Sequence, residues 1–175
     1  GKFLYPGTLV NDVTYRTSGK KKIKGLTSLQ KQFVFTDESH VFSQSWAGKV
    51  FIKTPFASAK MLAGDDAFNF MVSDGKQLAL INKDKIIYSE SSTSDPILDL
   101  KYNSNTFWIL KKSGVYTSTI SQPKTTQIAK GNNFTAFDIS KDGQTLFIGT
   151  SNGYIEQDLM LGTSKTNTKL PSTTI

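Results

Sequence analysis

Apolar and polar positions alternate along most of the chain. The alternation is clearest in residues 33–35, 68–72, 78–80, 98–102, 137–139 and 146–148. A period of two puts every second side chain on the same face of a β-strand, whereas a helix repeats about every 3.6 residues. The pattern therefore predicts strands almost throughout and an all-β fold.

One segment has a spacing closer to that of a helix. Residues 56–66 are rich in alanine, methionine and leucine, but Pro55 precedes them and Gly64 interrupts them. Proline and glycine both limit the length of a helix. A short helix, a loop and a further strand all remain open for this segment.

Aspartate or asparagine followed by glycine occurs at three points between alternating segments. The three pairs are Asp74-Gly75, Asp142-Gly143 and Asn152-Gly153. Such pairs supply the positive backbone φ angles that tight two-residue hairpins need. The alternating segments are therefore expected to form hairpins in series.

These hairpins repeat along the chain in units of similar plan. Four blade-like units share the plan, at about residues 33–60, 68–96, 97–133 and 134–160. If Phe35, Phe70, Leu100 and Phe137 are equivalent, the units follow one another after 35, 30 and 37 residues. Blades of the best-known propellers repeat after about 40 to 45 residues. Three strands are visible in each unit, and the links between units leave room for a fourth.

The repeat predicts a single β-propeller-like domain over residues 1–175, with about four to five antiparallel blades. Residues 3–15 and 159–170 contain further apolar positions that could together form a fifth blade. Four blades are the lower limit for a closed ring, so a partial propeller is also expected, completed by a second copy or another protein. A β-sandwich is the alternative fold, because short strands with regular turns predict both architectures.

Residues 146–154 resemble the propeller repeat of two-component regulators. The shared order is an aromatic residue, isoleucine, glycine and threonine, then two residues, a glycine and a hydrophobic residue. Phe147 stands where that family usually has tryptophan. A looser copy in residues 107–116 keeps Trp108, Ile109, Gly114 and Tyr116. This resemblance implies an extracytoplasmic sensor domain that binds a small ligand or dimerises.

Residues 137–155 are similar to the blades of WD-repeat proteins and related propellers. The middle strands of those blades follow a Ser-x-Asp-Gly turn, which matches residues 140–143. The Gly-His and Trp-Asp dipeptides of true WD repeats are absent. The resemblance implies a propeller architecture rather than one particular family.

Composition limits the chemistry that the chain can perform. Its 175 residues are 37% hydrophobic and 11% aromatic, which predicts one folded domain, and they include no Cys and a single His, His40. Thiolate metal sites, disulfides and multi-histidine metal sites are therefore excluded. Ser39 and His40 are neighbours, and neighbours in a strand point to opposite faces, so they are not expected to act together. The sequence predicts no catalytic residue, metal site or cofactor, and no segment long enough for membrane insertion.

Positive charge is concentrated in the first third of the chain. The net charge is +7, and residues 1–60 hold ten Lys/Arg against three Asp/Glu, whereas the rest holds eleven of each. The densest cluster consists of Arg16, Lys20, Lys21, Lys22 and Lys24. Cations within a Debye length add their potentials, so this cluster can contact phosphates or an acidic surface. The alternative is a solvated lysine run that protects a strand edge.

Aromatic residues are expected mainly in the packing between blades. Phe51, Phe107, Trp108 and Phe147 lie on alternating segments, where burial is the usual role. Trp46 differs, because it lies between a serine and a small Ala-Gly pair and can therefore be exposed. We expect Trp46 to be an apolar anchor for a partner.

The sequence therefore favours a non-enzymatic recognition or scaffold module of propeller type. A protein partner is expected first, and the basic cluster adds an acidic surface or nucleic acid as candidates. A homo-oligomer or a larger propeller would complete the ring. The alternative function is an extracytoplasmic ligand-sensing domain of a bacterial signalling protein. A chain without cysteine is compatible with the cytoplasm, the nucleus or a bacterial periplasm.

Overall fold

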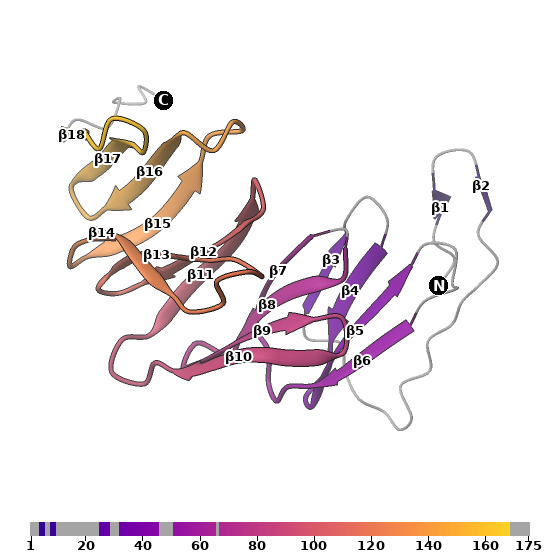
Figure 1. Cartoon of the computed structure of the whole chain (residues 1–175). Coiled ribbons are helices and arrows are strands. Elements are labelled where there is room, and N and C mark those ends of the chain that lie inside the picture. Colours follow the sequence, from indigo (N-terminus) through magenta and orange to yellow (C-terminus); the bar gives the residue numbers. More distant parts are fainter. Residues whose placement is uncertain are drawn as a thin grey trace, which may run out of the picture.

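The computed structural model describes residues 4–5, 8–9, 25–28, 32–45, 51–65 and 67–168. Every helix or strand assigned within these residues is a β-strand (Figure 1). The strands are β1 (Leu4–Tyr5), β2 (Thr8–Leu9), β3 (Gly25–Ser28), β4 (Gln32–Thr36), β5 (His40–Ser45), β6 (Phe51–Pro55), β7 (Met61–Gly64), β8 (Asn69–Ser73), β9 (Gln77–Asn82), β10 (Lys85–Ser91), β11 (Ile97–Asn103), β12 (Thr106–Lys111), β13 (Gly114–Ser118), β14 (Thr126–Lys130), β15 (Phe134–Ile139), β16 (Thr145–Thr150), β17 (Gly153–Asp158) and β18 (Ser164–Asn167).

The strands from β3 onward form four antiparallel sheets. Each sheet contains four strands in chain order, and we name them the first (β3–β6), second (β7–β10), third (β11–β14) and fourth sheet (β15–β18). Figure 1 shows them one after another in a curved array, with the first and fourth sheets at opposite ends. The first strands of successive sheets contact one another, as blades do around a common axis.

Three apolar clusters fill the spaces between successive sheets. Phe70 and Val72 on β8 pack towards the first sheet, whereas Met71 between them packs towards the third. Alternation along each strand therefore gives the sheet two apolar faces. This is why the inner strands contain runs of apolar residues rather than a strict alternation with polar ones.

The second strands of the four sheets show the repeat most clearly. Each of these strands has an equivalent residue on the face that points onward along the array, towards the next sheet in the first three sheets. These residues are Val34, Met71, Trp108 and Phe147. They lie 37, 37 and 39 residues apart. The spacing is more regular than the sequence indicated, because Phe35 and Phe70 lie on second strands whereas Leu100 and Phe137 lie on first strands.

The prediction of an all-β, propeller-like array is confirmed. The alternative of a β-sandwich is wrong, because the described strands form four successive sheets rather than two facing layers. The segment 56–66 contains strand β7, so its helical alternative is also wrong. Strand β18, within residues 159–170, is the fourth strand of the fourth sheet.

Glycine is required where the third and fourth strands come together. Gly153 is the first residue of β17 and has a φ of 146°. A Cβ atom there would lie 2.0 Å from the carbonyl oxygen of Asn167 on β18. Gly114 has the same place in the third sheet, where a Cβ would lie 2.1 Å from the carbonyl oxygen of Ala129. Only glycine allows this close pairing of the outer strands.

Candidate interaction surface

The predicted binding residues lie outside the described part of the chain. These residues are Arg16, Lys20, Lys21, Lys22, Lys24 and Trp46. In the chain, the basic cluster comes immediately before β3, and Trp46 lies in the connection between β5 and β6. Their roles therefore stay predictions, and the description below concerns the remaining surface and the contacts between sheets.

His40 is the first residue of β5, directly after the turn from β4. The carboxylate of Asp37 accepts hydrogen bonds from the backbone N–H groups of Ser39 and His40, at 2.6 and 2.7 Å. The imidazole Nδ1 of His40 lies 3.8 Å from Asp37 Oδ1, which is beyond hydrogen-bond distance. The buried Asp37 side chain thus shapes the turn between β4 and β5.

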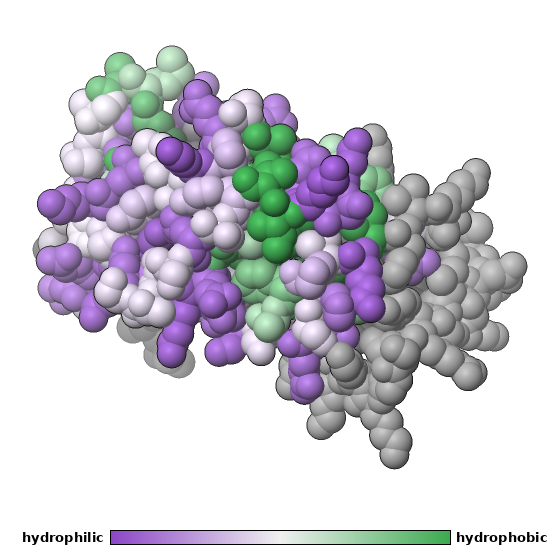
Figure 2. Space-filling view, turned by 60° about the horizontal axis from the view of Figure 1, so that its bottom comes forward, coloured by the Kyte–Doolittle hydropathy of each residue, from purple (hydrophilic) through white to green (hydrophobic). Residues whose placement is uncertain are grey.

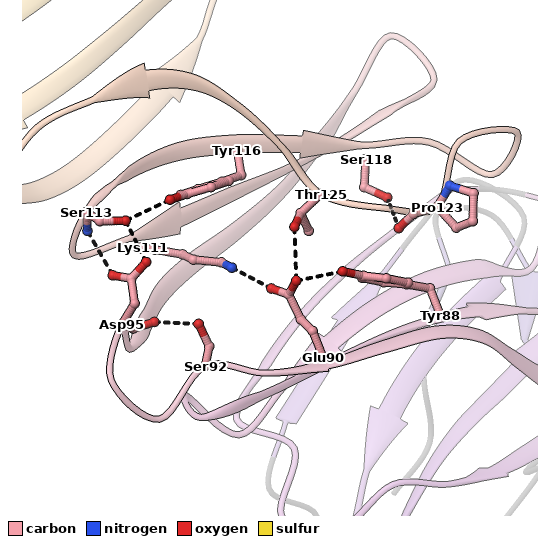
Figure 3. A network of polar contacts seen from close by, with 10 residues as sticks. All are labelled: Tyr88, Glu90, Ser92, Asp95, Lys111, Ser113, Tyr116, Ser118, Pro123 and Thr125. Atoms are coloured by element: carbon pink, nitrogen blue, oxygen red, sulfur yellow. Dashed lines mark hydrogen bonds and ion pairs between the residues drawn. The ribbon is translucent and has the colours of Figure 1, made fainter.

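A polar network joins the second and third sheets (Figure 3). Its centre is Glu90 on β10, whose carboxylate accepts hydrogen bonds from Lys111 on β12 and from the hydroxyls of Tyr88 and Thr125. The hydroxyl bonds are 2.7 and 2.9 Å long. The Lys111 ammonium also lies 4.6 Å from the centre of the Tyr116 ring, which adds a cation–π contact.

The surroundings of Glu90 determine its charge. Burial alone would raise the pKa of its carboxyl group, but the hydrogen bonds from Lys111, Tyr88 and Thr125 and the charge of Lys111 lower this pKa below its ordinary value. Glu90 is therefore ionised at neutral pH and forms a salt bridge with Lys111. The two side chains are only 18% and 8% exposed, so solvent screens this pair weakly.

Asp95 extends the same network along the loop between β10 and β11. Its carboxylate accepts hydrogen bonds from the backbone N–H and the hydroxyl of Ser113, and the Ser113 hydroxyl lies 2.8 Å from the Tyr116 hydroxyl. Ser92 donates a 2.6 Å hydrogen bond to the carbonyl oxygen of Asp95. These contacts hold the loop between the second and third sheets against the β12–β13 turn, which is a structural role.

A smaller polar contact joins the third and fourth sheets. Lys101 on β11 lies 2.9 Å from Asp138 on β15 and 5.7 Å from the centre of the Phe137 ring. The hydrogen bond from Lys101 lowers the pKa of Asp138. Asn103 also donates a 2.8 Å hydrogen bond to the carbonyl oxygen of Ser140. The Asp138 side chain is 70% exposed, so this ion pair contributes little stability.

Sequence reasoning missed Glu90 and Lys111. A lysine directly after the apolar residues 107–110 of a buried strand is the signal that could have identified Lys111, because a buried cation needs an anionic partner. No comparable signal exists for Glu90, since β10 is mostly exposed and polar. The pairing depends on which sheets are neighbours, which local sequence does not contain.

The described residues contain neither a metal-binding cluster nor a membrane-spanning helix. Within the ranges given above, no group of three or more His, Cys, Asp or Glu side chains is arranged to hold a metal ion. Over the same ranges, no helix is long and apolar enough to cross a membrane.

We call the face of the fourth sheet that points away from the third sheet its outward face, and it is more exposed than the equivalent faces of the other sheets. Val34, Met71 and Trp108 face the next sheet and are 0%, 0% and 6% exposed, whereas the equivalent Phe147 is 37% exposed. The expectation that Phe147 packs between blades is therefore wrong in this structure, although it is correct for Phe107 and Trp108. The side chain of Phe51 is outside the described part.

Hydrophobic side chains are exposed elsewhere on the described surface as well. Figure 2 shows them in a band across the middle of the molecule and in a second group at the upper left. The large hydrophobic residues with substantial exposure are Ile86, Ile87, Leu98, Ile128, Phe147, Met160 and Leu161. The last three belong to the fourth sheet and its β17–β18 turn, where Met160 and Leu161 are each 75% exposed.

Comparison with solved structures shows the fold. The chain is similar to NirN, a dihydro-heme d1 dehydrogenase in complex with DHE, with a TM-score of 0.66 and 14% identity over 84% of this chain and 36% of that one. The WD40 domain of Pan2 from Neurospora crassa gives a TM-score of 0.54 and 13% identity, covering 82% of this chain and 51% of that domain.

A third similar structure is the extracellular domain of a proposed one-component system from B. thetaiotaomicron. Its TM-score is 0.58 at 13% identity, and the match covers 92% of this chain and 26% of that one. The chain thus spans between about a quarter and half of these three structures. No protein-family model and no curated protein matches the sequence. The matched structures, together with the four successive sheets, show that the chain has a β-propeller-like fold.

Proposed function

We propose that this chain is a non-enzymatic recognition module that binds an acidic surface of another protein. The observation that carries the proposal is the charge distribution, because the entire excess of seven positive charges falls within residues 1–60. A one-sided positive potential attracts acidic partners and speeds their association. The propeller fold supports this role, since it displays many loops on a rigid scaffold.

The proposed contacts come from two places near the first sheet. Arg16, Lys20, Lys21, Lys22 and Lys24 provide anionic contacts immediately before β3. Trp46, between β5 and β6, provides the apolar anchor that such an interface needs. Gly25 pairs with Thr36 whereas Ser45 pairs with Gln32, so the two segments adjoin opposite ends of the first sheet. A partner that contacts both must therefore extend along the length of the strands.

A second candidate function is ligand sensing outside the cytoplasm. It is favoured by the match to the extracellular domain from B. thetaiotaomicron, which covers 92% of this chain. A sensor of this type would bind a small ligand or dimerise. In both functions, a larger propeller, another protein or a second copy would complete the ring.

The proposal is tested with poly-L-glutamate as a model acidic chain. Changing Lys20, Lys21, Lys22 and Lys24 to Glu should weaken its binding at least tenfold, or about 1.4 kcal/mol, and flatten the dependence of affinity on salt. Fluorescence anisotropy over a series of NaCl concentrations measures both effects. Binding should be tighter to poly-L-glutamate than to double-stranded DNA of equal charge.

The matched control reverses four exposed lysines elsewhere. Lys76, Lys83, Lys85 and Lys112 lie in the second and third sheets or the turns beside their strands, and their replacement by Glu changes the net charge equally. This control should retain most of the affinity. Equal losses in the two variants, or tighter binding to DNA, would contradict the proposal.

A further inference from the structure

The three methionines of the chain lie in very different surroundings. Met71 on β8 is fully buried in the apolar cluster between the second and third sheets, and Met61 on β7 is partly buried against the same cluster. Met160, in the β17–β18 turn, is 75% exposed. The thioether sulfur is the reactive group of methionine, and a dissolved oxidant must reach it. The fold therefore gives three identical side chains very different access to solvent.

The β17–β18 turn has a fixed shape that leaves Met160 in solvent. The carboxylate of Asp158 accepts 2.8 Å hydrogen bonds from the backbone N–H groups of both Met160 and Leu161. The backbone N–H of Leu159 donates a 2.9 Å hydrogen bond to the carbonyl oxygen of Gln144. Leu159 also packs against the apolar cluster between the third and fourth sheets. Leu159 is thus the residue that anchors the turn to the core, and Met160 points away from it.

The chain offers an oxidant no sulfur atom other than those of its methionines. A cysteine thiolate would be the usual first target of a peroxide, but the sequence contains no Cys. Of the three thioethers, only that of Met160 belongs to a highly exposed residue. A peroxide that encounters the folded protein therefore meets this sulfur first.

We propose that Met160 is a site of reversible oxidation by peroxides. A lone pair of the sulfur attacks one oxygen of hydrogen peroxide, so that an S–O bond forms while the O–O bond breaks. The released hydroxide takes the proton from the transferred oxygen and leaves as water. The sulfur loses two electrons, and the peroxide is reduced. The product is methionine sulfoxide, which is polar and chiral where the thioether was apolar.

This oxidation changes the surface and leaves the fold intact. Met160 belongs to none of the three apolar clusters between the described sheets. A sulfoxide there stays in water, whereas a sulfoxide at Met71 would place a polar group in the core. The turn loses part of the apolar surface that Met160 forms together with the equally exposed Leu161. Because the sulfoxide is exposed, methionine sulfoxide reductases can reach it and restore the thioether.

Peptide mapping after treatment with about 10 mM hydrogen peroxide at pH 7 tests the site. Trypsin leaves Met160 in residues 142–165, and Met61 and Met71 together in residues 61–76, where fragment masses distinguish them. Met160 should gain one oxygen at least about tenfold faster than Met71, because Met71 reacts only when the core opens. In about 6 M guanidinium chloride the three methionines should react at similar rates, since the fold no longer protects any of them.

The consequences are measured on protein oxidised at Met160 alone. Its retention in hydrophobic-interaction chromatography should fall, and its midpoint of urea unfolding should stay unchanged. A mixture of methionine sulfoxide reductases A and B, one for each epimer of the sulfoxide, should remove the added oxygen. Met160→Leu is the control, because it keeps an apolar side chain without sulfur. Its retention should not change with peroxide.

Three results would overturn the proposal. They are oxidation of Met71 within about threefold of the rate of Met160 in the folded protein, a sulfoxide that the reductases leave in place, and an unchanged retention after oxidation. The reaction needs neither the basic cluster nor Trp46. This proposal and the proposed function can therefore fail separately.

Discussion

At the scale of single residues, the Glu90–Lys111 pair is the polar contact between sheets with the larger expected effect on stability, because the Lys101–Asp138 pair is much more exposed. Both side chains are mostly buried between the second and third sheets, and both have several partners. The net contribution of such a pair compared with apolar residues is small. Removal of one partner is costly, however, because a buried charge loses the group that neutralises it.

Lys111→Met should therefore lower the free energy of unfolding by about 2 to 3 kcal/mol at pH 7, because Glu90 keeps only its bonds to Tyr88 and Thr125. The double variant with Glu90→Gln should recover at least half of the loss. Urea unfolding followed by tryptophan fluorescence measures both values. A loss in Lys111→Met of less than about 0.5 kcal/mol would show that the pair is not buried in solution.

The pH dependence provides an independent readout for the same pair. The pKa of Glu90 is lower in the folded protein than in the unfolded chain, so ionisation of Glu90 stabilises the fold above the unfolded pKa of about 4.3. This contribution is lost as the pH falls through the folded pKa. The stability difference between the unchanged protein and Glu90→Gln should accordingly become smaller below about pH 4.

At the scale of elements, the outer strands depend on their glycines. Gly153 lets β17 approach β18, and β18 has mostly exposed polar residues, so backbone pairing holds it in place. The sequence analysis assigned residues 159–170 to a possible fifth blade, whereas β18 completes the fourth sheet, and its exposure explains the difference. A solvent-exposed strand lacks the apolar alternation from which strands are recognised. The same is true of β14, where only Ala129 is buried.

Gly153→Ala should detach β18 from the fourth sheet, with a loss of at least about 2 kcal/mol, because its Cβ would overlap the Asn167 carbonyl oxygen. Gly162→Ala is the matched control, since Gly162 also has a positive φ, of 66°, but no atom within 4 Å of an added Cβ. It should cost only about 1 kcal/mol. Faster amide hydrogen exchange in residues 164–167 should occur in Gly153→Ala alone.

At the scale of the whole molecule, the order of the sheets decides which apolar residues are buried. Phe107 on β12 faces the second sheet and is fully buried, whereas Phe147 on β16 faces outward and is 37% exposed. The strand pattern predicted both as packing residues. The difference arises from the neighbouring sheet. Within the described ranges, the second sheet packs on Phe107, whereas no sheet packs on the outward face of the fourth sheet.

Phe107→Ala should therefore cost about 3 to 5 kcal/mol, whereas Phe147→Ala should cost less than about 1 kcal/mol. Both values are measured by thermal unfolding of the two variants and the unchanged protein at the same protein concentration. A similar loss in the two variants would mean that another part of the chain covers Phe147 in solution.

Much of this fold could be predicted from the sequence, and the reason is physical. The apolar alternation and the turn at Asp74-Gly75 are local signals, so the middle strands and hairpins were found. Strand β7 was ambiguous because Met61–Gly64 is apolar at every position, as suits a strand covered on both faces. The partner of Lys111 and the exposure of Phe147 depend on contacts between sheets, which sequence periodicity does not reveal.

Each described sheet is formed by one uninterrupted stretch of chain, and no strand is shared between two sheets. Duplication or deletion of one stretch of about 37 residues would therefore add or remove a whole sheet without changing the partners of any other strand. The surfaces on either side of the new unit would only need to match in shape and polarity. Evolution can thus alter the number of units, and with it the curvature and reach of the array, in single genetic steps.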